Sequence, residues 1–555
     1  MAFQLSPGVL VTEKDLTTVV PAVASTRGGI VGYFKWGPVG EIREIDSENN
    51  LKKVFGVPDN DTAVDFMTAA SFLAYGSALQ VVRVVDQSSA LNAGATAGVL
   101  ITNDDDYDNN HSDGSGSNGM WAAKWAGSLG NSLKVSFADS SDYSTWAYKD
   151  NFGYAPSATT SAAAQGGSVD ELHIIVIDED GDFTGTAGTI LEKFEGVSKA
   201  SDAVDSVGAS NYYKNVINTQ SEYIWWTDHP ASDSTWGQKQ STTFTSAHTS
   251  SESTVSLANG ADAAPADGDK QNGYALFAND ELVDVSLLMA SGHSQTVGKW
   301  IQDNVATVRK DCLVFISPQK SAVVNNAGSE AADVVTDRNT YTTTSYSVFD
   351  SGWKYMYDRY NDVFRWIPLN GDIAGLCVNT DLTADAWFSP AGYNRGQIKN
   401  AIKLAFSPKK SERDTLYQAG VNPVVGFPGA GIVLFGDKTM LQKPSAFDRI
   451  NVRRLFIVLE KAIATAAKFS MFEFNDEFTR AQFTSIIEPF LRDVKGRRGL
   501  YDFKVVCNES NNTDQVIDSN SFVADIFLKP TKSINFVQLN FVATRTGVSF
   551  EEVGG

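Results

Sequence analysis

The sequence predicts a multidomain protein of mixed α/β and α+β structure. Its 555 residues are too many for one hydrophobic core and indicate three or four domains, at roughly 150 residues per domain. Apolar residues make up 42% of the chain and aromatic residues 11%, which is the composition of a folded protein. Helix-like and strand-like apolar patterns occupy both ends of the chain, whereas polar, low-complexity segments interrupt the middle.

The chain opens with a strand-like segment that has no partner nearby. Residues 3–15, FQLSPGVLVTEKD, break at Pro7 and Gly8 and continue in a short apolar run. The residues of this run are Val9, Leu10, Val11 and Thr12. An unpaired strand exposes N–H and C=O groups that proteins normally hide or pair. The partner therefore lies far along the chain or in another chain.

A β-α-α-β pattern follows and predicts a compact α/β unit. GGIVGYF is typical of a strand, and SENNLKKVFG predicts a short helix that begins at a Ser47 cap. The next helix starts with Thr62 and Asp65 at capping-box spacing, and ALQVVRVVD reads as a buried strand. The same character resumes after residue 291, where a helix capped by Ser294 leads into the strand CLVFIS.

The middle of the chain predicts a β-rich insertion with soft loops. Residues 87–119 are poor in large apolar side chains and read as a surface loop, whereas LKVSFAD and ELHIIVID read as strands. Between residues 101 and 290 there are 28 Asp and Glu against 8 Lys and Arg. This part of the molecule is therefore strongly acidic.

The last third of the chain predicts an α+β domain in which basic residues outnumber acidic ones. Residues 391–504 hold 19 Lys and Arg against 11 Asp and Glu. INVRRLFIVLEKAIATAAKFSMFE predicts a helix of about six turns with one apolar stripe, followed by a second helix and terminal strands. Two interpretations stay open: the solvated faces of the chain differ by chance, or the basic part faces an acidic partner. The basic residues around the apolar stripe are Arg453, Arg454, Lys461 and Lys468.

No motif in the sequence predicts an enzyme, a cofactor site or a metal site. DEDGDFTG lacks the Gly and Glu positions of a calcium loop, and FPGAGIVLFG is not a dinucleotide fingerprint. The five histidines lack metal-ligand spacing, and the three cysteines never form a CxxC pair. No secretory signal and no membrane-spanning run are present, and a net charge of −21 argues against nucleic acid as a partner. These observations favour a structural role.

Strings in the same order along the chain resemble the contractile tail sheath proteins of myovirus-type bacteriophages, with T-even-type sheaths the most similar. The likeness is dense at both ends and from residue 291 onward, and loose in the acidic middle. The strings that carry it are LSPGVLVTE, GYFKWGPVG, DFMTAASFLAYG, LQVVRVVD, RKDCLVFISP, YDRYNDVFRWIPLNGDIAGLC, SPAGYNRGQI, FDRINVRRLF, FEFNDEFTRAQF and INFVQLNFVAT.

The resemblance implies a domain order and one departure from the family. Large T-even sheaths carry an outer domain after the strand that matches LQVVRVV, and here only residues 86–119 occupy that place. We therefore expect the outermost domain to be missing. The predicted domains are an N-terminal arm at 1–22 that belongs to an inner domain, a middle α/β domain at 23–86 and 291–408, a peripheral acidic β-rich insertion at 87–290, and an inner, tube-facing and subunit-linking domain at 409–555 with a C-terminal arm.

The resemblance also implies a function and partners. Such subunits form stacked hexameric rings around a tail tube and contract to drive the tube through the host envelope, without a nucleotide or cofactor. The implied partners are neighbouring sheath subunits, the tube protein, and baseplate and tail terminator proteins, in a virion assembled in the host cytoplasm. The implied intersubunit arms are residues 3–13 and 534–544, with Val9, Leu10, Val11, Thr12, Phe536, Val537, Leu539 and Phe541 as the pairing residues.

Four alternatives stay open. The arms can instead pair within their own subunit, and salt bridges within the subunit can account for the four basic residues as well as an acidic tube does. A tail-associated hydrolase of envelope polysaccharide is the alternative function, because carboxylates are many and aromatic residues cluster between Trp353 and Trp366. A bacteriocin or secretion-system sheath would share the same mechanism.

Overall fold

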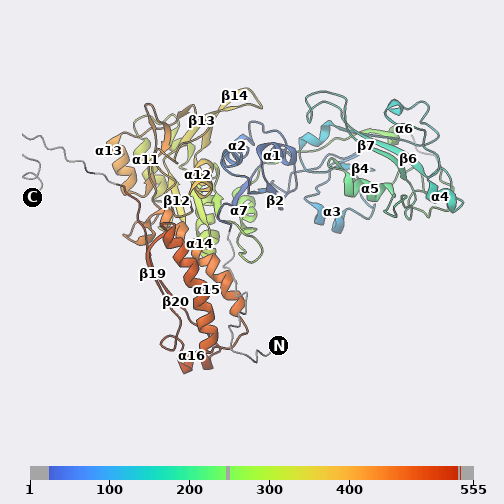
Figure 1. The fold of residues 1–555 in the computed structure, drawn as a ribbon. Coiled ribbons are helices and arrows are strands. Elements are labelled where there is room, and N and C mark those ends of the chain that lie inside the picture. The colour runs from blue at the N-terminus through green and yellow to red at the C-terminus, as the bar shows by residue number, and fades with distance from the viewer. Residues whose placement is uncertain (1–23, 246–249, 536–537, 539–555) are drawn as a thin grey trace, which may run out of the picture. The chain divides into compact units, whose positions relative to one another are not determined.

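The chain forms two compact units, and the computed structural model describes residues 24–245, 250–535 and 538. Within that part, unit 1 comprises residues 387–389 and those from 454 onward, and unit 2 comprises the rest. Figure 1 colours the chain by position, so that unit 1 contains the orange and red helices near the C-terminal end. Among the described residues, no helix is both long and apolar enough to cross a membrane.

A seven-stranded sheet organises unit 2, with the order β16-β12-β11-β10-β1-β3-β2. All neighbours in it run parallel except β2, which pairs antiparallel with the edge of β3. Every residue of β1 and β3 is buried, as expected for a sheet covered on both faces. Its strands are β1 (Gly28–Gly32), β2 (Ile42–Ile45), β3 (Leu79–Arg83), β10 (Leu287–Met289), β11 (Leu313–Ile316), β12 (Ser347–Asp350) and β16 (Val421–Asn422).

The helices of this α/β part begin largely where the sequence predicts them. Ser47 and Ser294 each accept a hydrogen bond from a backbone N–H three residues later, which confirms both caps. The capping box at Thr62 is wrong, because the Asp65 carboxylate instead accepts hydrogen bonds from Tyr33 N and Ser291 Oγ. The helices are α1 (Glu48–Phe55), α2 (Ala63–Leu73), α7 (Asp267–Ala275), α8 (Gln295–Ile301), α9 (Thr307–Arg309), α10 (Lys320–Val323), α11 (Glu330–Arg338), α12 (Asn370–Thr383) and α13 (Lys410–Gln418).

Two small antiparallel sheets complete the α/β part of unit 2. One has the order β14-β13-β15, in which β13 and β14 form a hairpin from Trp353 to Pro368. The other is the β17–β18 hairpin, which closes through a Gly-rich turn. The strands are β13 (Trp353–Asp358), β14 (Val363–Pro368), β15 (Lys403–Leu404), β17 (Val424–Phe427) and β18 (Gly431–Leu434).

The acidic middle of the chain is β-rich, as predicted, and it leaves and rejoins the sheet at adjacent points. The backbone N–H of Asp86 donates to the carbonyl of Ala263 at 3.2 Å, so the two ends of this insertion lie side by side. Its core is aromatic, with Trp121 and Trp226 fully buried. Its elements are α3 (Asp104–Asn110), β4 (Trp121–Ala123), β5 (Leu133–Ala138), α4 (Thr160–Ala164), β6 (Glu171–Asp178), β7 (Thr189–Ser198), α5 (Tyr213–Gln220), β8 (Ile224–Trp226), α6 (Ser250–Ser253) and β9 (Thr254–Ser256).

Unit 1 is built on α14 from Arg454 onward, a second long helix and a two-stranded sheet. The chain leaves α14, passes through a short 3₁₀ turn at Lys468–Ser470, and enters α15 at its Asp476 cap. Strands β19 and β20 pair antiparallel with each other. The elements are α14 (Ile450–Ala467), α15 (Glu477–Gly496), β19 (Leu500–Val506), α16 (Asp514–Asp518) and β20 (Asp525–Pro530).

The structure differs from two predicted domain boundaries and from one predicted loop. The inner domain was expected from residue 409, but residues 409–453 lie in unit 2 because β16 is the seventh strand of its sheet. The insertion was expected to reach residue 290, but β10 pairs with β1 and the chain has rejoined the sheet by Ala263. Residues 87–119 are not a plain surface loop, because α3 lies within them and buries Tyr107 against Trp225.

Candidate functional site

The carboxyl edge of the parallel sheet is where α/β folds usually bind ligands. Polar side chains do gather there. Ser291 follows β10, Ser317 follows β11, and Asp350 ends β12. All three are buried, so a solute has no direct access to them. The question is whether they form a reactive site or a closed network.

One part of this edge is held by Asp65 of α2. Its carboxylate accepts hydrogen bonds from Tyr33 N at 2.8 Å and from Ser291 Oγ, which ties α2 to the ends of β1 and β10. His293 Nε2 donates to the carbonyl of Val31 at 2.8 Å, and burial lowers the pKa of this imidazole. A neutral, donating histidine fits a packing role rather than one in catalysis.

The neighbouring part is held by Asp350 and Asn370. Asp350 accepts from Gly352 N at 2.8 Å and is 2.6 Å from Ser317 Oγ. Asn370, the first residue of α12, donates from Nδ2 to the carbonyl of Ser291 at 2.8 Å. Burial raises the pKa of Asp350 to about 8, so this carboxyl keeps its proton at neutral pH.

Asp350→Asn is expected to flatten the dependence of stability on pH. The folded protein keeps a proton that the unfolded chain loses above about pH 4, so the free energy of unfolding of the wild type falls as pH rises from about 4 towards 8. An asparagine does not titrate, so this decline disappears. Urea unfolding midpoints between pH 4.5 and 7.5 measure it, with exposed Asp61→Asn as the control. Parallel profiles for wild type and Asp350→Asn would refute a protonated Asp350.

A buried ion pair closes the same region. Lys354 Nζ lies 2.9 Å from Asp372 Oδ1, both side chains are at most 1% exposed, and Tyr75 Oη donates to the same carboxylate oxygen at 3.2 Å. Lys354 belongs to the β13–β14 hairpin and Asp372 to α12. The carboxyl edge of the sheet is thus filled by protein groups that bond to one another. It fits a structural core and not an active site.

The calcium-like segment of the insertion is a turn that satisfies itself. The Asp178 carboxylate is 2.7 Å from Ser132 Oγ and accepts from the backbone N–H groups of Gly181, Phe183 and Thr184. The DDDYDNN segment forms helix α3 and not a loop. Within the described residues, no group of three or more His, Cys, Asp or Glu is arranged to hold a metal ion.

The four predicted basic residues do not form one surface. The guanidinium of Arg453 stacks on the rings of Phe447 and Tyr346, at 3.9 Å and 4.5 Å, and only 5% of the residue is exposed. Arg454 is buried as well. Lys461 is half-buried and Lys468 is exposed. Sequence periodicity could not distinguish a buried, stacked arginine from a solvated one.

The predicted arm residues lie outside the described part of the chain. These are Val9, Leu10, Val11, Thr12, Phe536, Val537, Leu539 and Phe541. The sheet that such arms could join is described, because β19 and β20 pair only with each other among the described residues. Along β20, half-buried and exposed residues alternate, so one face of the sheet is partly covered. Within the described part of the chain, no further strand pairs with either outer edge of this sheet.

Sequence analysis missed an exposed aromatic segment between α14 and α15. We call residues 469–478 the aromatic tip. The string FSMFEFNDEF was interpreted partly as helix, whereas α14 ends at Ala467. The available signal was the spacing of Phe472, Phe474 and Phe478, which fits no single helical stripe. The exposed apolar residues of the tip are Phe469, Met471, Phe472, Phe474 and Phe478.

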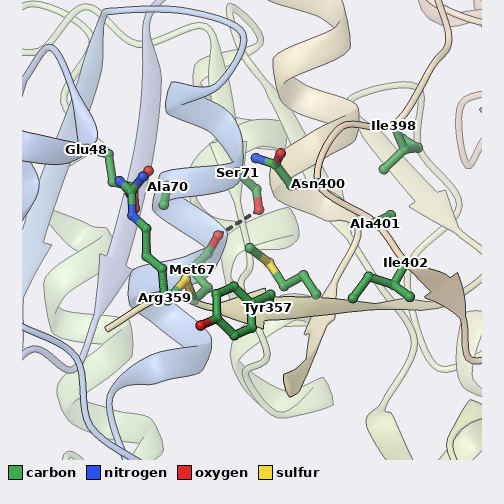
Figure 2. A pocket seen from close by; sticks show the side chains of 11 residues that line it. Glu48, Met67, Ala70, Ser71, Tyr357, Arg359, Ile398, Asn400, Ala401 and Ile402 are labelled. Carbon is green, nitrogen blue, oxygen red and sulfur yellow. Dashed lines mark hydrogen bonds and ion pairs between the residues drawn. The ribbon is translucent and has the colours of Figure 1, made fainter. Parts of the chain in front are cut away.

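A half-open groove of about 430 Å³ lies in unit 2 between α2 and the β13–β14 hairpin. We call it the α2–β13 groove. Figure 2 shows lining side chains from separate segments, among them Met67 of α2, Tyr357 and Arg359 of the hairpin, and Ile402. Its other lining residues are Glu48, Ala70, Ser71, Met356, Ile398, Asn400 and Ala401. Apolar side chains contribute somewhat more of the lining than polar ones, and the lining contains no histidine or cysteine.

Three family models match successive parts of the chain. The N-terminal region of tail sheath protein Gp18 domain III matches residues 25–84. The phage tail sheath protein central domain matches residues 271–440, and the phage tail sheath C-terminal domain matches residues 442–544. Most of the acidic insertion falls between the first two matches.

Three full-length relatives are tail sheath proteins. That of Vibrio phage KVP40 is 34% identical and aligns with 99% of this chain and 100% of its own length. That of Enterobacteria phage T4 is 31% identical over 99% of both chains, and that of Salmonella phage ViI is 32% identical over 100% of this chain and 98% of its own. The alignment with the Vibrio phage protein runs over 675 residues, so that protein has segments without a counterpart here.

Solved structures share the fold at low identity. The sheath tail protein of Listeria innocua has a TM-score of 0.54 at 13% identity, over 92% of this chain and 96% of its own. That of Desulfitobacterium hafniense has a TM-score of 0.52 at 12% identity, over 95% and 100%. The helical sheath of the anti-feeding prophage in its contracted state has a TM-score of 0.52 at 11% identity, over 98% and 100%. The chain therefore belongs to the phage tail sheath proteins, the structural subunits of contractile tails, and it is not an enzyme.

Proposed function

We propose that this sheath subunit assembles in the host cytoplasm as stacked hexameric rings around a tail tube, between a baseplate and a tail terminator. Contraction of the sheath then drives the tube through the host envelope. Such a polymer needs a heterologous interface that repeats along a helix. It also needs two packings of the same subunit, separated by a barrier. A related sheath is described in a contracted state, which supports the second requirement.

The open β19–β20 sheet carries this proposal. A two-stranded sheet is marginal by itself, and its unpaired edges accept further strands. Strand addition supplies affinity through backbone hydrogen bonds and specificity through alternate side chains. Residues 3–13 and 534–544 of neighbouring subunits would fill the two edges. The linkage would then persist while the rest of the interface rearranges.

Unit 1 would also face the tube. Of the four basic residues, Lys461 and Lys468 keep access to solvent and are the candidates for an acidic tube surface. Exposed charge contacts contribute only about 0–1 kcal/mol each. Weak contacts suit a surface that must release the tube on contraction.

The test of the arm is to replace Val9 and Val11 by proline. Proline has no backbone N–H, so Val9→Pro/Val11→Pro removes two donors from the added strand. We expect a folded subunit with an unchanged melting midpoint that forms no tubes by electron microscopy. The control, Val9→Thr/Val11→Thr, keeps the donors and the β propensity and should form tubes as the wild type does.

Three results would contradict this proposal. Tube formation by the proline variant would show that the arm is dispensable. A lower melting midpoint of its monomer would show that the segment pairs within its own subunit. Discrete wild-type particles without tubes would contradict the polymer itself.

A further inference from the structure

The aromatic tip exposes more apolar surface than a free monomer usually tolerates. Phe472 is 100% exposed, and Phe474, Phe478 and Phe469 are 84%, 75% and 67% exposed. At about 200 Å² per phenylalanine, these residues and Met471 leave roughly 700 Å² of apolar surface in water. The largest apolar patch on a typical monomer is about 300–600 Å². One side of a standard protein interface buries about 800 Å². The tip is therefore close to a complete half-interface.

Hydrogen bonds hold the C-terminal part of the tip in place. Asp476 caps α15 by accepting from Thr479 N at 2.8 Å. Asn475 Nδ2 donates to the carbonyl of Ser521 at 2.7 Å, and Arg480 Nη1 donates to Asn475 Oδ1 at 2.9 Å. Phe472 has a φ of 68°, a conformation that costs free energy for a bulky residue. A fully exposed aromatic residue kept in a strained conformation on an anchored base indicates a binding element.

The α2–β13 groove has the size and chemistry to receive aromatic side chains. Its volume of about 430 Å³ exceeds the roughly 150 Å³ that holds one benzene ring in a protein cavity. Met67 and Met356 line it, and methionine adapts its shape to aromatic partners. Ile402 at its lip is 59% exposed and Tyr357 is 46% exposed, so apolar surface continues outside the groove.

The edge of β13 next to the groove is open. β15 pairs with β13 only at Lys354 and Tyr355, so in the described part of the chain no strand continues that pairing along Met356 and Tyr357. Backbone groups are thus available beside the apolar lining. A segment of another chain that lies along this edge can use them.

The charges of the two surfaces are complementary. The tip carries Glu473, Asp476 and Glu477 among its phenylalanines. Lys399 and Lys403 follow the lining residues Ile398 and Ile402 in the chain, and both are exposed. Lys399 Nζ donates to the carbonyl of Ala74 at 2.7 Å, and Lys403 Nζ lies 4.9 Å from the centre of the Tyr355 ring. The two charged residues that line the groove itself, Glu48 and Arg359, pair with each other at 2.8 Å. The surface next to the groove is therefore basic, whereas the tip is acidic.

We propose that the aromatic tip of one subunit docks in the α2–β13 groove of another copy of the chain. This inference rests on the proposed polymer and names one of its contacts. Two different patches on one chain make a heterologous interface, which is the kind that propagates along a helix. Phe472 and Phe474 fill the groove, and the acidic side chains beside them face Lys399 and Lys403.

Site-specific cross-linking tests this contact directly. In a Cys507→Ser background, the remaining cysteines, Cys312 and Cys377, are buried. Chains with Phe472→Cys are mixed with chains with Ile402→Cys, assembled and treated with a short bis-maleimide. We expect a covalent dimer. The matched control pairs Phe472→Cys with Leu382→Cys, which is 70% exposed but lies on α12 outside the groove, and should give none.

Charge reversal provides the second measurement. Glu473→Lys/Glu477→Lys and Lys399→Glu/Lys403→Glu should each raise the concentration needed for assembly at least tenfold, and mixing the two variants should restore it. Wild-type tubes without the Phe472–Ile402 cross-link, or reversals without effect, would overturn the docking contact and leave the polymer intact. Absence of tubes from the wild-type chain would overturn both.

Discussion

Replacing Arg83 with methionine should lower the free energy of unfolding by roughly 3–5 kcal/mol. Arg83 ends β3, is 1% exposed, and donates to the carbonyls of Phe34, Gly37 and Ala126 at 2.8, 2.7 and 2.6 Å. Each carbonyl left unsatisfied in the interior costs about 1–3 kcal/mol. The variant no longer has to bury a cation, and this offsets part of the loss. The cost of burying the cation is visible in the pKa of Arg83, which burial lowers to about 10.

The control for this prediction is Arg27→Met. Arg27 forms an ion pair with Glu44 at 3.6 Å in which both side chains are at least 40% exposed, so the expected loss is about 0–1 kcal/mol. The free energy of unfolding of Arg83→Lys should fall between those of wild type and Arg83→Met, because one ammonium group cannot reach the three carbonyls that the planar guanidinium reaches. Urea unfolding followed by tryptophan fluorescence measures all three variants. A loss below about 1 kcal/mol for Arg83→Met would mean that Arg83 is not a structural clamp.

Asp139→Asn should destabilise the acidic insertion by roughly 3–5 kcal/mol, because it leaves a buried lysine without its counter-charge. Lys199 Nζ lies 2.7 Å from Asp139 Oδ2, and neither side chain is exposed. Burial by itself would raise the pKa of Asp139, but the attraction and hydrogen bond of Lys199 together with the hydrogen bonds from Ser141 lower it below its ordinary value. The stabilisation is therefore present above the ordinary carboxyl pKa and is lost as pH falls through the lowered value.

Fluorescence of Trp236 reports on this pair, because its ring lies 5.0 Å from Lys199 Nζ. The comparison is Glu222→Gln in the Lys53–Glu222 pair, whose side chains are 66% and 57% exposed and which should lose at most about 1 kcal/mol. If the free energy of unfolding fell equally in the two variants, the stabilising role of the buried pair would be contradicted. If the free energies of unfolding of Asp139→Asn and wild type became equal in acid, that role would be supported.

The sequence predicts the elements of unit 2 well where local chemistry and packing agree. Ser47 and Ser294 cap helices as expected, and the apolar strings at β1, β3, β6 and β11 are strands. The prediction fails at Asp65 because a tertiary contact to Tyr33 and Ser291 replaces the local capping bond. It fails at residue 409 because two residues of β16 pair with β12, and so short a strand leaves no pattern in the sequence.

The functional surfaces are harder to predict than the fold. A strict helical reading places Arg453 on a solvated side of α14, yet its guanidinium stacks on two aromatic rings. Charge alone does not say whether an arginine is a partner contact or a packing group. The α2–β13 groove combines residues from four separate stretches between Glu48 and Ile402, so no sequence window contains it. Family resemblance, which rests on ordered strings, gave the assembly role that single motifs could not.

The two ends of the insertion, at Asp86 and Ala263, lie next to each other, so the insertion joins the rest of unit 2 at a single place. A domain whose entry and exit share one hydrogen bond can grow, shrink or be exchanged without a change in the register of β1, β3 and β10. Length differences among relatives can therefore accumulate at this point while the strands of the sheet stay constant. A foreign domain could be inserted at the same place, and a sheath would then display one copy of it per subunit.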